Sequence, residues 1–521
     1  MRKIWLLLLL LADAVCWKHE KLPRYLVEFR GLVPSFRMLE LRDSIAYVVG
    51  SQSLAAELMG KFDVAVLDEV LEGSRVETYP LCGYLSLPNA LSAKEVAHRC
   101  ASVRSIIEVW GDGSSADTVR DQVQSTFAST VRPHFPLPKT DAERDSNSWK
   151  IVFRRFGKGG RSGLDPAGKR SFLSKFNSIL QNLGGDVNLT SPAHELVFLE
   201  DWSRFHAAAT EDSEAALLYT PERSFFGKIV GFGREVQTDY SLNRRPFLGT
   251  TSMAPLPAHL CAVSALVGSG SLVLDPFCGT GSILVSCAAL GASVVGSDID
   301  ADCLGLAPEG PDSRPLRERD RGKNFRLNKN RSKASKREGA PVIPSAGFSA
   351  CTRDNIAFYG LQDRLVGLLA RDIRDWLPGG RAGEVDEDAG EQIAGLGLTG
   401  PFDAIVTDPP YSRRERAVGS TSNNNIVGNS AIGGSYEGCS DIIRTLCAVA
   451  CARLKPGGRL VFWYPTDAFV EEADVRRMLE ATLPDEARVA LALNRLTCEK
   501  LHDKLWRWLV VYTRGSIDML S

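Results

Sequence analysis

The segment that decides the fold reads Ser271-Leu272-Val273-Leu274-Asp275-Pro276-Phe277-Cys278-Gly279-Thr280-Gly281-Ser282, and it predicts a buried strand, a glycine turn and a helix to Leu290. Gly279 and Gly281 leave space where a ligand approaches the backbone, and they permit dihedral angles that a Cβ atom opposes. The unpaired amides at the start of such a helix attract an anionic group. This unit indicates an α/β sheet with a ligand site, although a tight turn without a ligand shows the same pattern.

A second predicted strand, Ser293–Asp298, follows the helix and ends in a carboxylate. In doubly wound nucleotide-binding folds, a carboxylate at this place accepts hydrogen bonds from the ribose hydroxyls. The glycine loop lacks both the G-x-G-x-x-G spacing and the lysine of a P-loop, which disfavours dinucleotides and triphosphates. The pattern favours an adenosine-containing cofactor without phosphates, such as S-adenosylmethionine.

A further carboxylate, that of Asp372, comes just after a strand predicted at Leu365–Leu369. It is a candidate to bind the adenine amino group of the cofactor. An ordinary cap at the end of a strand is an equally good interpretation.

A third apolar strand, beginning at Phe402, ends in the motif Asp408-Pro409-Pro410-Tyr411. Proline fixes its own backbone and has no amide hydrogen, so the Asp408 carboxylate and the Pro409 carbonyl are held as rigid acceptors. Two acceptors on an exocyclic amine favour the tetrahedral nitrogen needed for attack, and Tyr411 offers a face on which a base stacks. The motif alone fits a proline-terminated strand and turn, but with the glycine loop it predicts methyl transfer to a base that has been turned out of its stack.

Length and composition are those of a multidomain globular protein. The 521 residues suggest roughly two to four domains. The net charge of −1 shows no basic excess, so any nucleic-acid surface must be local. The twelve cysteines include no C-x-x-C pair, which argues against a disulfide scaffold and against a zinc site in this chain and favours a reducing compartment.

The start of the chain resembles a secretory signal, because Arg2-Lys3 precede an apolar run from Ile4 to Ala12. The run is too short to span a bilayer as a helix. An upstream extension or a misassigned start codon explains it as well, and the downstream sequence favours an intracellular protein without a membrane segment.

Two α/β blocks precede the motifs. We expect strands at Tyr25–Phe29, Trp149–Phe153, Leu196–Leu199 and Ala216–Tyr219, helices at Phe36–Ala46, Ala93–Val109 and Lys169–Leu183, and a linker over Pro136–Ser148. Neither block has a clustered nucleophile and base, which favours a binding or scaffolding role. Their basic residues suit phosphates, although a solvated face shows the same charges: Arg154, Arg155, Lys158, Arg161 and Lys169.

A basic segment interrupts the third block. Asp312 to Arg337 contains eleven lysines and arginines against three acidic residues, with Phe325 as its single aromatic residue. Such a composition cannot bury a core, so we expect a flexible insertion. Binding to RNA phosphates and simple solvation both fit it.

Several stretches together resemble the eukaryotic tRNA (guanine-10)-N2-methyltransferase family, catalytic subunit. They are Ile106 to Gly111, Trp149 to Phe153, Phe226-Gly227, Arg245 to Met253, Asp275 to Gly281, Tyr359 to Leu361, Thr407 to Glu415 and Val461 to Pro465. In this family a small residue and an Arg-Glu pair follow the tyrosine, and here Ser412, Arg414 and Glu415 occupy those places. This extension separates the chain from DNA adenine and protein glutamine methyltransferases, which share the shorter motif.

The resemblance implies a domain plan. An N-terminal extension (residues 1–23) precedes an α/β domain (24–112), a THUMP-like RNA-binding domain (113–235) and a Rossmann-like class I S-adenosylmethionine-dependent methyltransferase domain (236–521) with an insertion at 304–349. It implies tRNA as substrate, a cytoplasmic location and a small zinc-binding activator subunit. The chain departs from the family in its signal-like start, its enlarged insertion and a Gly/Asn/Ser-rich loop at Val418–Ser435.

The resemblance also implies residue roles. Asp275, Gly279 and Gly281 receive the cofactor, Asp298 holds its ribose and Asp372 its adenine, Asp408 to Tyr411 grip guanine N2, and Arg414 and Glu415 contact the substrate. Two alternatives remain: a methyltransferase for another guanine, an adenine or a protein glutamine, and a non-catalytic tRNA-binding protein that keeps the fold.

Overall fold

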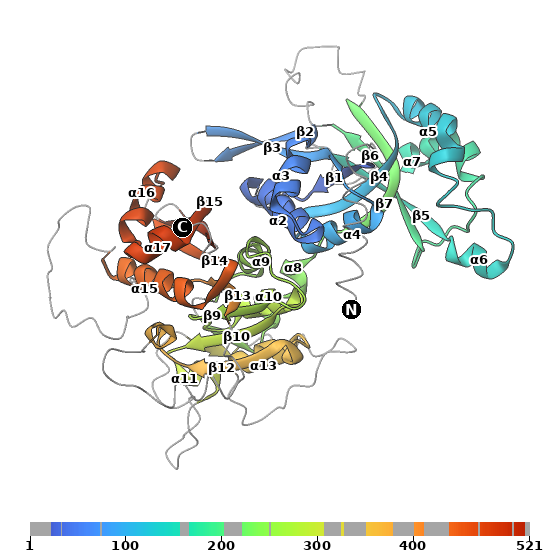
Figure 1. Ribbon diagram of the computed structural model, residues 1–521. Coiled ribbons are helices and arrows are strands. Elements are labelled where there is room, and N and C mark those ends of the chain that lie inside the picture. Colours follow the sequence, from blue (N-terminus) through green and yellow to red (C-terminus); the bar gives the residue numbers. More distant parts are fainter. Residues whose placement is uncertain are drawn as a thin grey trace. The chain divides into compact units, whose positions relative to one another are not determined.

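The computed structural model divides into two compact units, Met1–Arg234 and Glu235–Ser521 (Figure 1). It describes residues 22–32, 34–72, 75–156, 166–202, 221–249, 252–306, 325–327, 351–378, 401–410, 437–466, 469–502 and 505–515. Within these ranges, no helix combines the length and the apolar character that crossing a membrane requires.

The first unit is built on one seven-stranded sheet in the order β2-β3-β1-β4-β7-β6-β5. Its strands are β1 (Arg24–Phe29), β2 (Asp63–Glu72), β3 (Arg75–Ser86), β4 (Val103–Gly113), β5 (Trp149–Phe156), β6 (His194–Asp201) and β7 (Arg223–Phe232). Its helices are η1 (Pro34–Phe36), α2 (Arg37–Val49), α3 (Gln52–Gly60), α4 (Ala90–Arg99), α5 (Ala116–Thr130), α6 (Asp141–Ser146) and α7 (Pro166–Leu180). Strands β5 and β6 are parallel and the other pairs are antiparallel.

The pairing of β4 with β7 joins the two predicted N-terminal blocks in one sheet, because β4 comes from the first block and β7 from the second. Gly227 of β7 permits this close pairing, since a Cβ atom there would lie 2.1 Å from the Glu108 carbonyl oxygen. The division between residues 112 and 113 stays a prediction.

Helices α5 and α7 cover one face of the sheet with an aromatic core. Phe172 and Phe176 of α7 stack with ring centroids 4.1 Å apart, and both pack on Phe198 and Phe226 of the sheet. Burial of such large apolar side chains is the main stabilising contribution of this half of the unit.

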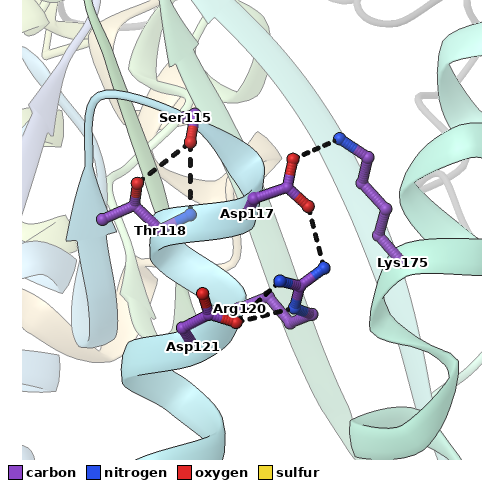
Figure 2. A network of polar contacts seen from close by, with 6 residues as sticks. All are labelled: Ser115, Asp117, Thr118, Arg120, Asp121 and Lys175. Atoms are coloured by element: carbon purple, nitrogen blue, oxygen red, sulfur yellow. Dashed lines mark hydrogen bonds and ion pairs between the residues drawn. The ribbon is translucent and has the colours of Figure 1, made fainter.

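A polar network fixes the start of α5 beside α7 (Figure 2). Ser115 caps α5 by accepting a hydrogen bond from the Thr118 amide (3.2 Å). Asp117 pairs with Arg120 of the same helix (2.8 Å) and with Lys175 of α7 (2.6 Å). These pairs are partly exposed, so they set the alignment of the two helices more than their stability.

The helix predicted over Ala93–Val109 is wrong in its second half. Helix α4 ends at Arg99, and β4 begins at Val103. The β-branched residues Ile106 and Ile107 are buried in the middle of the sheet, so tertiary pairing outweighs the helical spacing of the apolar residues.

The second unit contains a seven-stranded sheet in the order β12-β10-β9-β13-β14-β16-β15. Its strands are β9 (Leu272–Asp275), β10 (Ser293–Asp298), β12 (Leu365–Ala370), β13 (Phe402–Thr407), β14 (Leu454–Thr466), β15 (Leu491–His502) and β16 (Leu505–Arg514). The helical segments are α8 (Val236–Asp239), η5 (Leu242–Arg244), α9 (Pro255–Ser264), α10 (Ser282–Ala289), α11 (Ala301–Leu304), α13 (Thr352–Phe358), η6 (Gln362–Arg364), η7 (Ile373–Trp376), α15 (Glu437–Arg453), α16 (Glu472–Thr482) and α17 (Asp485–Ala490).

The five strands from β12 to β14 are parallel, and β16 enters antiparallel between β14 and β15. This is a doubly wound, Rossmann-like sheet, as predicted. The chain order reverses between β9 and β13, and ligands of such sheets bind at the carboxyl ends of the strands beside this switch point. The strands predicted around Val273, Val295, Leu368 and Ile405 are confirmed.

The basic insertion is described at three residues, which form β11 (Phe325–Leu327) and pair antiparallel with β8 (Phe247–Gly249). Other predictions lie outside the described residues. They are the signal-like start up to residue 21, the strand at residues 216–219, the rest of residues 307–350, and the loop at residues 411–436, which includes Tyr411, Arg414 and Glu415.

Candidate functional site

The site is organised around Asp275, the last residue of β9 at the switch point. The residue is 1% exposed. The Thr407 hydroxyl, at the end of β13, donates a hydrogen bond to Asp275 Oδ1 over 2.6 Å, and the Phe277 amide donates to the same oxygen over 3.2 Å. The two strands on either side of the switch point are therefore tied at their carboxyl ends.

Asp275 is an unusual carboxyl group. Burial raises its pKa to about 7, the hydrogen bonds from Thr407 and Phe277 oppose the rise, and the nearby carboxylates of Asp298 and Asp408 add to it. Three acidic side chains, one from each of three adjacent strand ends, thus face a common region. Such a region favours ligands that carry positive charge and hydrogen-bond donors.

The glycine loop follows β9 as predicted. Gly279 has φ of +46° and Gly281 has φ of +79°, a conformation in which a Cβ atom is strained. A Cβ atom on Gly279 would meet nothing within 4 Å, whereas one on Gly281 would lie 2.9 Å from Thr352 Cγ2. Gly279 therefore borders open space, and Gly281 is required by packing as the N-cap of α10.

Asp298 lies at the end of β10, as expected for a ribose ligand. Its Oδ2 accepts a hydrogen bond from the Gly279 amide (2.9 Å), and its Oδ1 accepts one from the Asp300 amide (3.1 Å). A carboxylate oxygen can accept hydrogen bonds from hydroxyl donors such as those of a ribose. Asp298 thus shapes the glycine loop, a task that the sequence did not indicate.

Helix α13 supports the loop from the other side, which sequence reasoning missed. The Thr352 hydroxyl donates to the Gly279 carbonyl oxygen (2.5 Å). The buried Asn355 amide donates to the carbonyl oxygens of Thr280 (2.9 Å) and Phe247 (2.8 Å) and accepts from the Phe247 amide (3.0 Å). The only sequence signal for this role was that two polar residues, Thr352 and Asn355, occur together in a short helix.

Asp372 is engaged as a helix cap. Its Oδ1 accepts from the Arg374 amide (2.9 Å), and both of its carboxylate oxygens pair with the Arg374 guanidinium (2.8 Å). This arrangement matches the capping interpretation. A role in binding adenine stays a prediction and requires Arg374 to leave or share the carboxylate.

The Asp408-Pro409-Pro410 segment follows β13 directly, so it lies at the switch point beside Asp275. Asp408 and Pro410 are partly exposed and Pro409 is buried. The segment that continues from Pro410 lies outside the described residues. Within the described ranges, no group of three or more histidine, cysteine, aspartate or glutamate side chains is arranged to hold a metal ion.

Comparison with known proteins extends these observations. Residues 64–235 match the family described as "Tmrp11 THUMP N-terminal domain". The tRNA (guanine(10)-N(2))-methyltransferase of Mus musculus is 26% identical over 87% of this chain and 82% of its own length. The chain resembles these methyltransferases along most of its length. The enzyme of that name from Saccharomyces cerevisiae is 25% identical over 83% of this chain and 84% of its own.

Among solved structures, TrmN from Thermus thermophilus aligns with 94% of this chain and 99% of its own, at 16% identity and a TM-score of 0.36. The family match ends within one residue of the first compact unit, which ends at Arg234. It begins in β2 and therefore spans the predicted division at residue 112.

The raised pKa of Asp275 predicts a pH-dependent stability. The unfolded carboxyl loses its proton near pH 3.9, whereas the folded one keeps it up to about pH 7, so ionisation costs stability as pH rises through this window. We expect wild-type stability to fall relative to Asp275→Asn between about pH 4 and 7, by at most about 1.4 kcal/mol per pH unit, and to level off above.

Urea denaturation of both proteins from pH 4 to 8 measures this difference, and taking the difference cancels other titrating groups. Asp485→Asn is the matched control, because Asp485 is fully exposed at the start of α17. A difference between wild type and Asp275→Asn that does not change with pH contradicts the prediction.

Proposed function

We propose that this chain transfers a methyl group from S-adenosylmethionine to the exocyclic N2 of guanosine 10 in tRNA. One observation supports the proposal: the hydrogen bond from Thr407 to Asp275 joins the strand end that precedes Asp408-Pro409 to the strand end that precedes the glycine loop. Methyl transfer requires the cofactor and the acceptor amine to be bound next to each other, and a cofactor loop and an amine-binding motif at one switch point would meet this requirement. The similarity to the mouse and yeast enzymes supports the same function.

The residues of the loop suit this cofactor. Asp298 offers lone pairs to ribose hydroxyls, and Gly279 leaves open space beside it. The acidic side chains at the strand ends favour the positive sulfonium and ammonium groups. When bound, S-adenosylmethionine supplies an electrophilic methyl carbon on its sulfonium sulfur.

The acceptor motif prepares the amine. The Asp408 carboxylate and the Pro409 carbonyl accept the two N–H hydrogens of guanine N2, which directs the nitrogen lone pair away from the ring. Bound S-adenosylmethionine would supply the methyl group to this nitrogen, and Asp408 or water would take the extra proton that the nitrogen then carries. Positioning and electrostatics supply most of the acceleration of such a step.

The purified chain together with its activator subunit, supplied with labelled cofactor and unmodified tRNA, should form N2-methylguanosine at one position. Mass spectrometry of the digested nucleosides identifies the product, and RNase mapping locates it. Label in another guanosine, in adenosine or in protein would show that the chain is a methyltransferase with a different acceptor from the one proposed. Tight tRNA binding without any labelled product would identify a non-catalytic binding protein.

Asp408→Ala should lower the rate of methyl transfer by at least about a hundredfold, because one of the two hydrogen-bond acceptors for the amine is lost. tRNA affinity, measured by filter binding, should remain nearly unchanged, since the phosphate contacts that dominate affinity stay in place. The control is Asp485→Ala, which should keep full activity. A large loss of tRNA affinity in Asp408→Ala would assign Asp408 to binding or folding instead.

We infer that the first unit binds tRNA and that a small zinc-binding activator subunit works with this chain, as the family resemblance implies. Adding that subunit from the same organism should raise both the yield of folded chain and the rate of methyl transfer severalfold. Size-exclusion chromatography with assays across the peak measures both. If the chain is fully active by itself and the subunit changes neither measurement, the activator subunit is not part of this enzyme.

We propose a cytoplasmic location. The ten cysteines that the structure describes form no disulfide with one another and eight of them are buried, as in proteins of a reducing compartment. Imaging of the chain tagged at its C-terminus tests this location. Accumulation in the secretory pathway would instead show that the apolar segment at the start of the chain acts as a signal peptide.

A further inference from the structure

Arg245 is a buried cation at the edge of the cofactor loop. Its side chain is fully buried, and it comes from the short segment between η5 and β8. Nη1 donates to Ser282 Oγ over 2.5 Å, and Nε donates to the Tyr359 hydroxyl over 3.4 Å. Ser282 is the first residue of α10, directly after the N-cap Gly281, so the guanidinium lies at the first turn of this helix.

This guanidinium lacks a counter-charge within the described residues. No carboxylate there forms an ion pair with Arg245, and Nη2 is buried without a hydrogen-bond partner. Burial lowers the Arg245 pKa, and the neighbouring Tyr359 hydroxyl offsets only part of the effect. A buried cation without an anionic partner is costly, since desolvation is not repaid.

The position adds a second cost. The N-terminus of α10 carries the positive end of the helix dipole and unpaired amides, so a cation beside it is repelled. An anion between the Arg245 Nη2 and the first amides of α10 would remove both penalties at once. The two features point independently to a negatively charged ligand group.

The charges around the glycine loop indicate which charged group of the cofactor binds on each side of it. Asp275, Asp298 and Asp408 occupy the strand ends, where they attract cationic groups and repel a carboxylate. Arg245 and the start of α10 lie past the glycine turn, on the helix side of the same loop. S-adenosylmethionine has one negative group, the carboxylate of its methionine portion, and two positive ones.

We propose that Arg245 binds the carboxylate of the methionine portion of the cofactor, together with the first amides of α10. This inference rests on the proposed function and adds a residue that fixes the cofactor's orientation. Arginine is suited to the role because its planar fork can donate to a carboxylate through Nη2 while Nη1 stays on Ser282. A tRNA phosphate is the competing anion, and the experiment separates the two.

The test is a binding cycle by isothermal titration calorimetry on the full chain. The ligands are S-adenosylhomocysteine and its decarboxylated analogue. The variant is Arg245→Gln, which can keep a hydrogen bond to Ser282, and the control is Arg244→Gln, which changes the exposed neighbour. We expect Arg245→Gln to weaken S-adenosylhomocysteine binding by roughly 10- to 100-fold and to leave the analogue nearly unaffected, as expected for loss of a charged hydrogen bond.

Other outcomes overturn the inference. Equal weakening of both ligands would make Arg245 a structural brace, and Arg245→Lys then distinguishes lost packing from lost charge through the melting temperature. Unchanged S-adenosylhomocysteine binding with weakened tRNA binding would assign the guanidinium to an RNA phosphate. If wild type binds neither ligand, the proposed function itself fails, whereas wild-type binding without discrimination by Arg245→Gln refutes this inference alone.

Discussion

The hydrogen bond from the Thr407 hydroxyl to the buried Asp275 carboxyl is the interaction on which the candidate site depends. It joins the two strands that flank the switch point, at the end of the sheet where ligands bind. Because the acceptor motif begins at the next residue, this contact sets its position relative to the glycine loop. Asp275 is 1% exposed, so the join is made in a region from which water is excluded, and this burial raises the pKa of its carboxyl group.

Charge is separated across the glycine loop. Carboxylates gather at the strand ends, and the Arg245 guanidinium lies with the start of α10 on the other side of the turn. The buried Arg245 guanidinium raises the energy of the folded chain because no carboxylate of the described residues pairs with it, and the neighbouring carboxylates raise it by repelling one another. A ligand with positive groups at one end and a carboxylate at the other relieves both costs. This complementarity orients the cofactor by electrostatics as well as by shape.

Much of the second unit was predictable because its signals are local. The apolar run ending at Asp275, the two glycines and the proline-terminated strand each follow from short-range backbone rules. The helix expected over Ala93–Val109 was wrong in its second half because β4 is stabilised by partners distant in sequence, β1 and β7. The spacing of apolar residues along the sequence carries no information about such distant partners. Asn355 and Thr352 were missed for the same reason, since their acceptors belong to the loop over seventy residues away.

The sequence by itself determined which residue types stand at the strand ends and that a glycine loop precedes an Asp-Pro-Pro motif. Only the tertiary structure decided that Asp275 and Thr407 meet and that Arg245 is buried at a helix start. The physical reason is that a residue's chemical type is local, whereas its hydration and its charged neighbours depend on elements far apart in the chain. Burial and proximity, not residue identity, set the pKa of Asp275 and leave Nη2 of Arg245 without a partner.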